Sequence, residues 1–361
     1  MHVIQNLNYG GMERLLADIV RRLPREKFSS HVLTLEYVGR FGEGLDQVAE
    51  LHMVQPARAV SLVYPRAMVK LMRRVRPDVV HSHSGVWYKA SLAARLAGVR
   101  RVVHTEHGRL IPDPWTSRAI DSLAARRTDV VVAVSEPLAD YLRRHIVRRP
   151  ERIRLVRNGV DTALYRRRAA AGAARARLGL PEDRPVIGSI GRLEFIKGYD
   201  VSIEAMAALP GMKLDGPRPL LVLAGDGSEK AKLAARVAEL GIGDDVRLLG
   251  WRDDVHDLHD SFTIFTMSSR SEGTSVSLLE AMSAGLCPVV TDVGGNRMVL
   301  GEELAHRLVP PLDPAALARA WQAALADPAR RERDGEKARE RVIHAFNLDD
   351  MVNAYAAIYA A

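Results

Sequence analysis

Short β-branched runs alternate with longer amphipathic segments from one end of the chain to the other. In the first half the runs are HVIQ, HVLTL, DVVHSH, RVVHT and DVVVAVS, and in the second half PVIGSIG, LLVLAGDG, DVRLLG, FTIFTMS and CPVVTD. Runs that stay apolar at successive positions are typical of strands buried on both faces, as in a parallel sheet covered by helices on each side. The alternation therefore predicts an α/β chain, ending in helices near 314–326, 328–345 and 348–360.

The alternation pauses at residues 162–185, TALYRRRAAAGAARARLGLPEDRP, which are rich in Arg and Ala and close with a Pro-bounded turn. A chain of 361 residues is also long for a single hydrophobic core. We therefore predict two doubly wound, Rossmann-like parallel-sheet domains facing each other across a cleft, which is the default ligand site. The predicted parts are an N-terminal domain at 1–165, a connection at 166–185, a C-terminal domain at 186–345, and a final helix at 346–361 that packs back on the N-terminal domain.

Composition limits where the chain is expected to work. The single cysteine, Cys287, excludes an internal disulfide and fits a reducing compartment, and its setting GLCPVV is typical of a small core residue entering a strand. No apolar run approaches the length of about 18 residues that a membrane span needs. We expect a cytoplasmic protein.

Charge is distributed unevenly between the two halves. Residues 1–170 contain 30 Lys and Arg against 16 Asp and Glu, whereas residues 171–361 contain 22 against 28. A basic half indicates an anionic partner, such as the inner face of a membrane or a phosphate-bearing acceptor, although the excess of Arg over Lys also fits codon bias. No basic-aromatic interleaving or nucleic-acid motif is present, so nucleic acid is not an expected partner.

The stretch GSIGRLEFIKG places Arg192 and Lys197 in the turn after a predicted strand, with Gly188 and Gly191 before them. Glycine lets a backbone approach a ligand closely, Arg clamps phosphate oxygens as a fork, and Lys adds a mobile charge. The alternative is a solvated Arg and Lys beside a helix start. The pattern is neither a P-loop nor a dinucleotide fingerprint.

Two glutamates flank a predicted helix start in SEGTSVSLLEAMSAG. Thr274 or Ser275 is a plausible cap and Gly285 a plausible end, which puts Glu272 on the loop and Glu280 inside the helix. Free backbone N–H groups in the first turn, together with a carboxylate, favour a ligand that carries both hydroxyls and phosphate. Glu280 could accept two hydrogen bonds from a vicinal diol such as ribose. A glutamate pair alone is more often surface charge.

Further glycines lie where predicted strands end. Gly10 and Gly11 in NYGGMER could admit a phosphate or sugar at a helix N-terminus, or could make a tight turn. Gly227 in AGDG could line the cleft or turn the chain.

Four histidines crowd two strand ends, in VVHSHSG and VVHTEHGR. His81 and His83 are two apart and therefore share a face, and His107 beside Gly108 is the most accessible to a ligand. Their spacing does not give the three close ligands that catalytic zinc keeps, so we expect no metal. Glu106 is a possible acid or base. The segment RDDVHDLHD at 252–260 is expected to be a solvated helix start.

Together these residues resemble glycosyltransferase family 4, which has the two-domain GT-B fold. The resemblance covers essentially the whole chain and depends most on the seven-residue spacing from Glu272 to Glu280, followed by AMSAGLCPVVTDVGG. GRLEFIKG, NGVD, AGDG, TEHG and NYGGMER support it in the family's order. One departure is Met298, which stands where many relatives carry a glutamate after the paired glycines.

The resemblance implies a role for each site residue. Arg192 and Lys197 would bind the donor diphosphate, Glu280 the ribose hydroxyls, and Glu272 the hydroxyls of the donor sugar. His107 would lie beside sugar and acceptor, and Gly11 near the phosphate. Main-chain groups would contact the sugar and phosphate at Gly273, Thr274, Ser275 and Val276.

The resemblance also implies a retaining, metal-independent transfer without a cofactor. The sugar would move from a nucleotide sugar, UDP first and GDP second, to a glycan or lipid-linked acceptor in polysaccharide or cell-surface glycan synthesis. The alternatives are a nucleotide-sugar 2-epimerase and a non-catalytic nucleotide- or glycan-binding subunit of the same fold.

Overall fold

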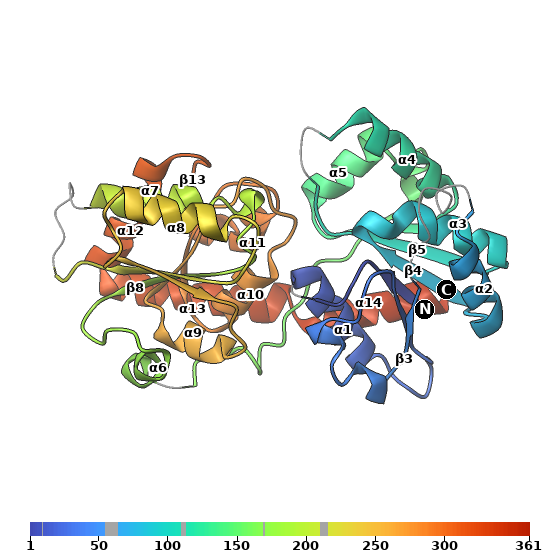
Figure 1. Ribbon diagram of the computed structural model, residues 1–361, viewed down its shortest axis with the longest axis horizontal. Helices are drawn as coiled ribbons and strands as arrows, with labels where there is room; N and C mark the ends of the chain where they lie inside the picture. Colours follow the sequence, from blue (N-terminus) through green and yellow to red (C-terminus); the bar gives the residue numbers. More distant parts are fainter. Residues whose placement is uncertain (9, 55–63, 110–112, 169, 210–215) are drawn as a thin grey trace. The chain divides into compact units, whose positions relative to one another are not determined.

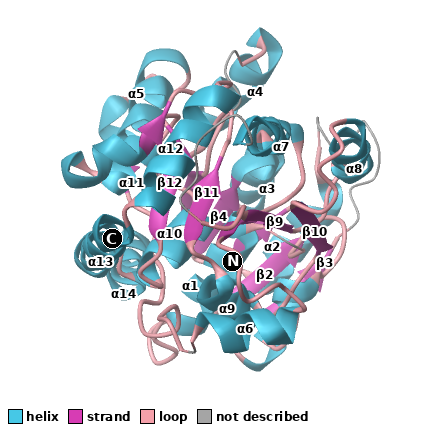
Figure 2. Ribbon diagram, turned by 90° about the vertical axis from the view of Figure 1, so that its left-hand side faces the viewer, coloured by secondary structure: helices cyan, strands magenta, loops and turns pink. Residues whose placement is uncertain are grey.

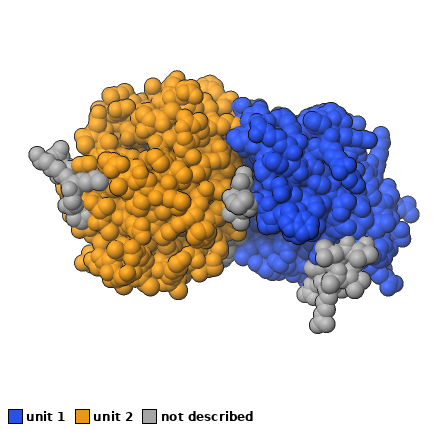
Figure 3. All heavy atoms as spheres, turned by 90° about the horizontal axis from the view of Figure 1, so that it is seen from above, with its two compact units in different colours: residues 1–158, 349–361 blue, residues 159–348 orange. Residues whose placement is uncertain are grey.

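In a computed structural model that describes residues 1–8, 10–54, 64–109, 113–168, 170–209 and 216–361, the chain divides into two compact units. The first unit comprises Met1–Asn158 and Asp349–Ala361, and the second comprises Gly159–Leu348 (Figure 3). Residues 166–185, expected to connect two domains, therefore belong to the second unit, where helix α6 (Ala171–Leu178) packs against helix α9 (Val255–Ser261).

The first unit is built on a parallel sheet with strand order β3-β2-β1-β4-β5-β6-β7. The order reverses between β1 and β4, which makes this the switch point of a doubly wound sheet. The strands are β1 His2–Ile4, β2 His31–Thr34, β3 Glu50–Met53, β4 Val79–His83, β5 Arg101–Glu106, β6 Val130–Ala133 and β7 Ile153–Leu155.

Helices cover both faces of this sheet (Figure 1). They are α1 Gly11–Arg22, α2 Arg66–Val75, α3 Trp87–Ala97, α4 Trp115–Arg126, α5 Glu136–His145 and the C-terminal α14 Leu348–Ala360, with 3-10 turns at Arg40–Gly42, Leu45–Gln47, Ser84–Val86 and Pro150–Arg152. The end of the chain packs on the sheet, because the hydroxyl of Tyr359 lies 2.6 Å from His81 Nδ1 and that of Tyr355 lies 3.1 Å from Thr105 Oγ1.

The second unit repeats the plan with a six-stranded parallel sheet of order β10-β9-β8-β11-β12-β13. Its switch point lies between β8 and β11. The strands are β8 Val186–Ile190, β9 Leu220–Ala224, β10 Val246–Gly250, β11 Ile264–Met267, β12 Cys287–Thr291 and β13 Leu308–Val309. The remaining helices are α7 Tyr199–Ala208, α8 Lys230–Glu239, α10 Val276–Ser283, α11 Asn296–Leu300, α12 Pro314–Ala326 and α13 Pro328–Ala345, with 3-10 turns at Phe195–Lys197 and Glu302–Arg307.

The core of the second unit explains why its strands lack polar alternation. Ile187 and Leu221 face a cluster that includes Trp321 of α12, while Val186 and Phe265 face a cluster on the opposite side. These four strand side chains are fully buried, as expected of central parallel strands between helical layers, and helices flank the strands in Figure 2. Cys287 is buried at the first position of β12, as its sequence setting predicts, and burial raises the pKa of its thiol to about 11.

Two expectations need correction. Strands β3, β7 and β13 have no counterpart among the predicted runs, because each is short and lies at or near a sheet edge. The segment 252–260 is not a solvated helix start, because His259 and Asp260 in α9 are buried.

Within the part of the chain that the structure describes, no helix is long and apolar enough to cross a membrane.

Candidate active site

Lys197 and the loop glutamate Glu272, both predicted from the sequence as site residues, meet at the switch point of the second sheet. Lys197 ends the 3-10 turn that follows β8, and Glu272 lies on the loop between β11 and α10. Strands β8 and β11 are hydrogen-bonded neighbours, with Ile187 opposite Ile264, although their sequences are about 80 residues apart. Ligands of doubly wound sheets bind outside the carboxyl ends of the strands at this point.

Lys197 and Glu272 form a direct ion pair. Nζ of Lys197 donates to Oε1 of Glu272 at 2.6 Å, and the Ser269 hydroxyl donates to the same oxygen at 2.6 Å. Both partners of the ion pair are largely shielded from water. Among the described residues Oε2 of Glu272 has no hydrogen-bond partner, so one oxygen of the carboxylate is fixed and the other is available.

Backbone and side-chain bonds tie together the two loops that carry this pair. The amide of Arg270 donates to the carbonyl of Ile196 at 2.8 Å, and the Ser268 hydroxyl donates to that of Gly198 at 2.7 Å. The Arg270 guanidinium donates one hydrogen bond to each carboxylate oxygen of Asp200, at 2.8 and 2.6 Å. Such bidentate pairs fix orientation as well as adding energy. Sequence analysis did not single out Ser268 or Arg270, because nothing in SSRSEG marks them as supports.

The paired glycines after β12 support the Glu272 loop from the other side. A Cβ on Gly294 would lie 1.7 Å from the carbonyl oxygen of Glu272, and one on Gly295 would lie 2.1 Å from that of Gly273. Gly294 has φ +54°, which L side chains rarely adopt, and the Gly295 amide donates to the Gly273 carbonyl at 2.9 Å. Nearby Met298, the residue that departs from the family pattern, packs partly buried against the apolar core.

Helix α10 follows the prediction at both ends. The Ser275 hydroxyl accepts from the amide of Leu278, which caps the helix, and Gly285 follows its end with φ +75°. Thr274 and Ser275 are buried on the loop, and Val276 is the first helical residue. Glu280 is buried within the helix.

Arg192 differs from Lys197 because it is exposed and has no side-chain hydrogen bond with any described residue. It precedes a loop contact in which the Leu193 amide donates to the Asp226 carbonyl at 2.9 Å. Gly227, predicted to line the site, lies against this loop, because a Cβ there would lie 2.5 Å from the Leu193 carbonyl oxygen. Its lack of a side chain is therefore required by the packing of the two loops.

In the first unit, side chains gather at the carboxyl ends of β1, β4 and β5. Gly10 and Gly11 form the turn from β1 into α1, and a Cβ on Gly10 would lie 2.2 Å from a carboxylate oxygen of Glu13. His81 and His83 share a face as predicted, with ring centroids 4.1 Å apart.

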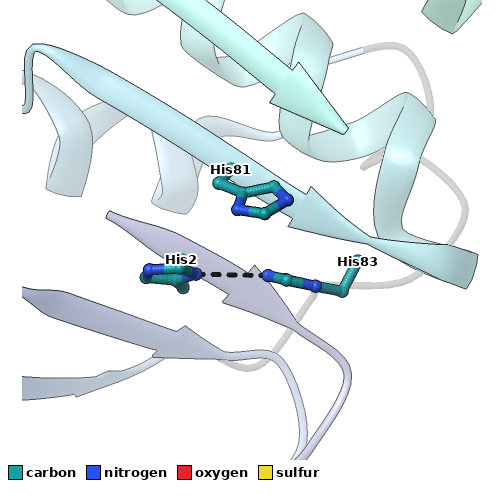
Figure 4. A group of neighbouring side chains, drawn as sticks. All are labelled: His2, His81 and His83. Carbon is teal, nitrogen blue, oxygen red and sulfur yellow. Dashed lines mark hydrogen bonds between the residues drawn. The ribbon is translucent and has the colours of Figure 1, made fainter. Parts of the chain in front are cut away.

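Hydrogen bonds link these imidazoles to neighbouring side chains, and Figure 4 draws the one between His2 and His83. His2 Nδ1 lies 3.2 Å from His83 Nε2, and His83 Nδ1 lies 3.1 Å from His107 Nε2. Both nitrogens of His81 are engaged, by Tyr359 and by Thr105. His2, His81 and His83 are close enough to one another for a metal, but both ring nitrogens of His81 are already held by the hydroxyl groups of Tyr359 and Thr105.

His107 is the most accessible of the four predicted histidines, since the other three are buried. Burial lowers the pKa of His107 to about 4, so the ring is neutral near pH 7. Glu106 is a poor base. Burial acts to raise its pKa, but nearby His104 and the Arg109 guanidinium, whose Nε donates to it at 3.1 Å, outweigh burial and lower the pKa to about 2.

The chain is similar to known proteins along most of its length. A model described as Glycosyltransferase Family 4 matches residues 9–164, and one described as glycosyl transferases group 1 matches residues 172–341. The lipopolysaccharide core biosynthesis glycosyltransferase LpsE of Rhizobium meliloti is 30% identical over 357 residues, covering 98% of this chain and 96% of the relative. An Escherichia coli UDP-Gal:alpha-D-GlcNAc-diphosphoundecaprenol alpha-1,3-galactosyltransferase is 25% identical over 97% of this chain and 93% of its own length. The crystal structure of Anabaena Alr3699/HepE in complex with UDP and glucose superposes with a TM-score of 0.88 at 21% identity, covering 99% of this chain and 98% of that one.

Proposed function

The chain belongs to the family 4 glycosyltransferases, whose GT-B fold its two Rossmann-like sheets adopt, and we propose that it transfers a hexosyl group from a nucleoside-diphosphate sugar with retention of configuration. The acceptor we propose is a glycan or a lipid-linked saccharide. The observation that carries this proposal is the arrangement at the second switch point. Lys197 holds one oxygen of Glu272, Oε2 of that carboxylate is available, and the Arg192 guanidinium is exposed nearby in sequence.

Each group matches one part of such a donor. Lys197 and Arg192 would bind the diphosphate and stabilise the charge that develops as it leaves. Oε2 of Glu272 would accept from a hydroxyl of the donor sugar, while Lys197 and Ser269 hold the other oxygen in place. Glu280 would accept from the ribose hydroxyls, and main-chain groups from Gly273 to Val276 would contact the sugar and phosphate.

The transfer we propose is a front-face displacement. The bond from the anomeric carbon to the β-phosphate oxygen breaks, and the acceptor oxygen bonds to the same face of that carbon. The acceptor proton passes to the departing phosphate oxygen, so the charge balances without a protein base. Because Lys197 and Arg192 supply positive charge at the leaving group, the step requires no divalent ion.

Uridine is the base we propose, with guanosine second. The Escherichia coli relative is named for UDP-Gal, and the Anabaena structure is described in complex with UDP and glucose. Polysaccharide or cell-surface glycan synthesis is the setting we propose, which agrees with the name of the Rhizobium meliloti relative.

The first unit would receive the acceptor. His107 is partly exposed and neutral near pH 7. Its Nε2 bonds to His83, so its buried Nδ1, which has no hydrogen-bond partner among the described residues, would accept from an acceptor or sugar hydroxyl. Gly10 and Gly11 leave the β1–α1 turn without side chains at the same end of that sheet. A basic half and the exposed apolar residues Trp115, Ile120 and Leu123 of α4 suit an acceptor held at an anionic membrane face.

The proposal is tested by incubating the purified chain with UDP-, GDP- and ADP-sugars and lipid-diphosphate saccharide acceptors, in chelator. Mass spectrometry would follow the acceptor, and the anomeric proton coupling would report the configuration of the product. We expect one sugar added with retention. Isomerisation of the donor without an acceptor would indicate the epimerase, and donor binding without either reaction would indicate a non-catalytic subunit.

A further inference from the structure

A second cluster of titratable side chains lies at the edge of the first sheet, outside the site described above. Strands β2 and β3 pair in parallel, with His31 opposite Glu50 and Leu33 opposite His52. Because side chains two apart on a strand point to the same face, this register places His31, Glu50 and His52 together. His31 and Glu50 are the first residues of their strands, so the set lies at the amino ends.

The three potential ligand atoms converge closely. Nδ1 of His31 lies 3.1 Å from Nε2 of His52, and the two nitrogens lie 3.4 and 3.6 Å from different oxygens of Glu50. The His52 side chain is 7% exposed at the base of the set, whereas that of Glu50 is 65% exposed. The group is therefore shielded on one side and open to solvent on the other.

The separation of the two nitrogens is close to that in a zinc site, and one oxygen of Glu50 lies within 4.8 Å of both nitrogens. With bonds of about 2.0–2.1 Å, the edges of a tetrahedral zinc coordination shell are about 3.3 Å long. We propose that His31, Glu50 and His52 bind one Zn²⁺, with water completing the tetrahedron on the open side. Two imidazoles and a carboxylate are a donor set that zinc takes in proteins.

The hydrogen bond between the two histidines must be replaced when a metal binds. Without metal, one of the two facing nitrogens carries a proton and donates a hydrogen bond to the other. Binding requires that ring to move its proton to its other nitrogen. Glu50 offsets the metal charge, while Arg74 and the amino terminus act electrostatically against a cation.

The placement indicates a structural role and not a catalytic one. Ligands of doubly wound sheets bind at the carboxyl ends of strands, and this site is at the opposite end of β2 and β3. The metal would cross-link the edge strand β3 to β2, so it would stabilise the first unit. This inference does not depend on the proposed transfer reaction, and its experiment needs no sugar donor.

The test uses the full chain without an affinity tag, freed of metal by a chelator that is then removed. Zn²⁺ is titrated calorimetrically at pH 7.5, and Co²⁺ is titrated by visible absorption, whose intensity reports tetrahedral geometry. We expect one Zn²⁺ per chain, intense Co²⁺ bands, and a melting temperature raised by a few degrees at saturating zinc. Each of Glu50→Gln and His52→Ala should weaken binding at least tenfold.

Matched variants separate the site from general effects. Glu26→Gln and His344→Ala change exposed residues of the same types and should bind zinc as the wild type does. Glu50 is exposed, so Glu50→Gln should fold normally and retain nucleotide binding, which keeps the test decisive if His52→Ala unfolds. Binding of no metal, or binding unaffected by Glu50→Gln and by His31→Ala, would overturn the proposal.

Discussion

Nζ of Lys197 lies 2.6 Å from Oε1 of Glu272, although the two residues are 75 positions apart in the chain. The contact exists because β8 and β11 are neighbours at the switch point and because Arg270 and Ser268 tie their loops together. Cation and carboxylate are thus assembled before a donor arrives. A site positioned in advance loses less free energy in ordering its groups when substrate binds.

Lys197→Ala should lower turnover by about 10²–10³-fold, which is the usual effect of removing one group that stabilises transition-state charge. The loss should appear mainly in kcat, because the charge on the leaving diphosphate grows in the transition state. Lys230→Ala is the matched control, since Lys230 is an exposed lysine paired with Asp226 in the same unit. Steady-state kinetics with equal loss in both variants would contradict the assignment.

Gly294→Ala should damage the site through the backbone. A Cβ there would meet the Glu272 carbonyl oxygen at 1.7 Å, so the Glu272 loop must move, and we expect turnover to fall at least tenfold. Gly241→Ala is the control, because Gly241 also has positive φ, at +65°, but nothing lies within 4 Å of its Cβ. That variant should cost only about 1–2 kcal/mol of stability. If both variants were equally active, the support of the loop by Gly294 would be refuted.

His259 should make the second unit less stable in acid. The ring is buried, neither nitrogen has a hydrogen-bond partner among the described residues, and burial, with a smaller effect of His256, lowers its pKa to about 3. Between pH 6.5 and about 3 the unfolded chain binds a proton at this position that the folded chain does not, so stability falls as pH falls.

His259→Met should therefore flatten the dependence of stability on pH. Relative to its effect at pH 8, the variant should gain on the order of 2 kcal/mol at pH 5. Urea unfolding at both pH values measures this, with the exposed His344→Met as the control. If the free energy of unfolding changed equally with pH in the wild type and in His259→Met, His259 would not contribute to the loss of stability in acid.

The exposed apolar residues of α4 should bind anionic membranes. Trp115 is 73% exposed at the start of this helix, and Ile120 and Leu123 further along it are exposed as well. Trp115→Ser should weaken sedimentation with phosphatidylglycerol vesicles severalfold, because an exposed aromatic side chain contributes most at the lipid interface. Tyr64→Ser, which replaces another exposed aromatic residue of the same unit, is the control. If Trp115→Ser sedimented with vesicles as strongly as the wild type, or if the wild type did not sediment, the proposed membrane contact of α4 would be wrong.

The buried strands, and the loops that carry the candidate site residues, could be predicted from the sequence for the same physical reason. Strands such as LLVLA are apolar on both faces, so their position and the loops at their carboxyl ends can be recognised in the pattern. The final helices α12, α13 and α14 have their predicted bounds. The edge strand ELHM has no apolar run, and the convergence of His31, Glu50 and His52 depends on its register with β2, which no local pattern encodes.

The hydrogen bonds that hold the site loops in place could likewise not be predicted from the sequence. The bonds from Arg270 to Asp200 and from Ser269 to Glu272 follow from loop conformation, and SSRSEG has no distinctive spacing. The segment 162–185 looked like a connection because its Arg/Ala composition has little apolar periodicity. Its helix α6 nevertheless packs on α9, and Arg175 bonds to the Ser261 carbonyl at 3.0 Å.

The most direct test of the proposed donor site is calorimetric titration of the wild type and Glu280→Gln with UDP in chelator, with GDP and ADP as competing nucleotides. The account predicts that UDP binds the wild type without metal. It also predicts that Glu280→Gln, which keeps the shape of the side chain but loses the charged acceptor, binds about 10–100-fold more weakly. Failure of all three nucleotides to bind the wild type, or equal binding of UDP by both proteins, would contradict it.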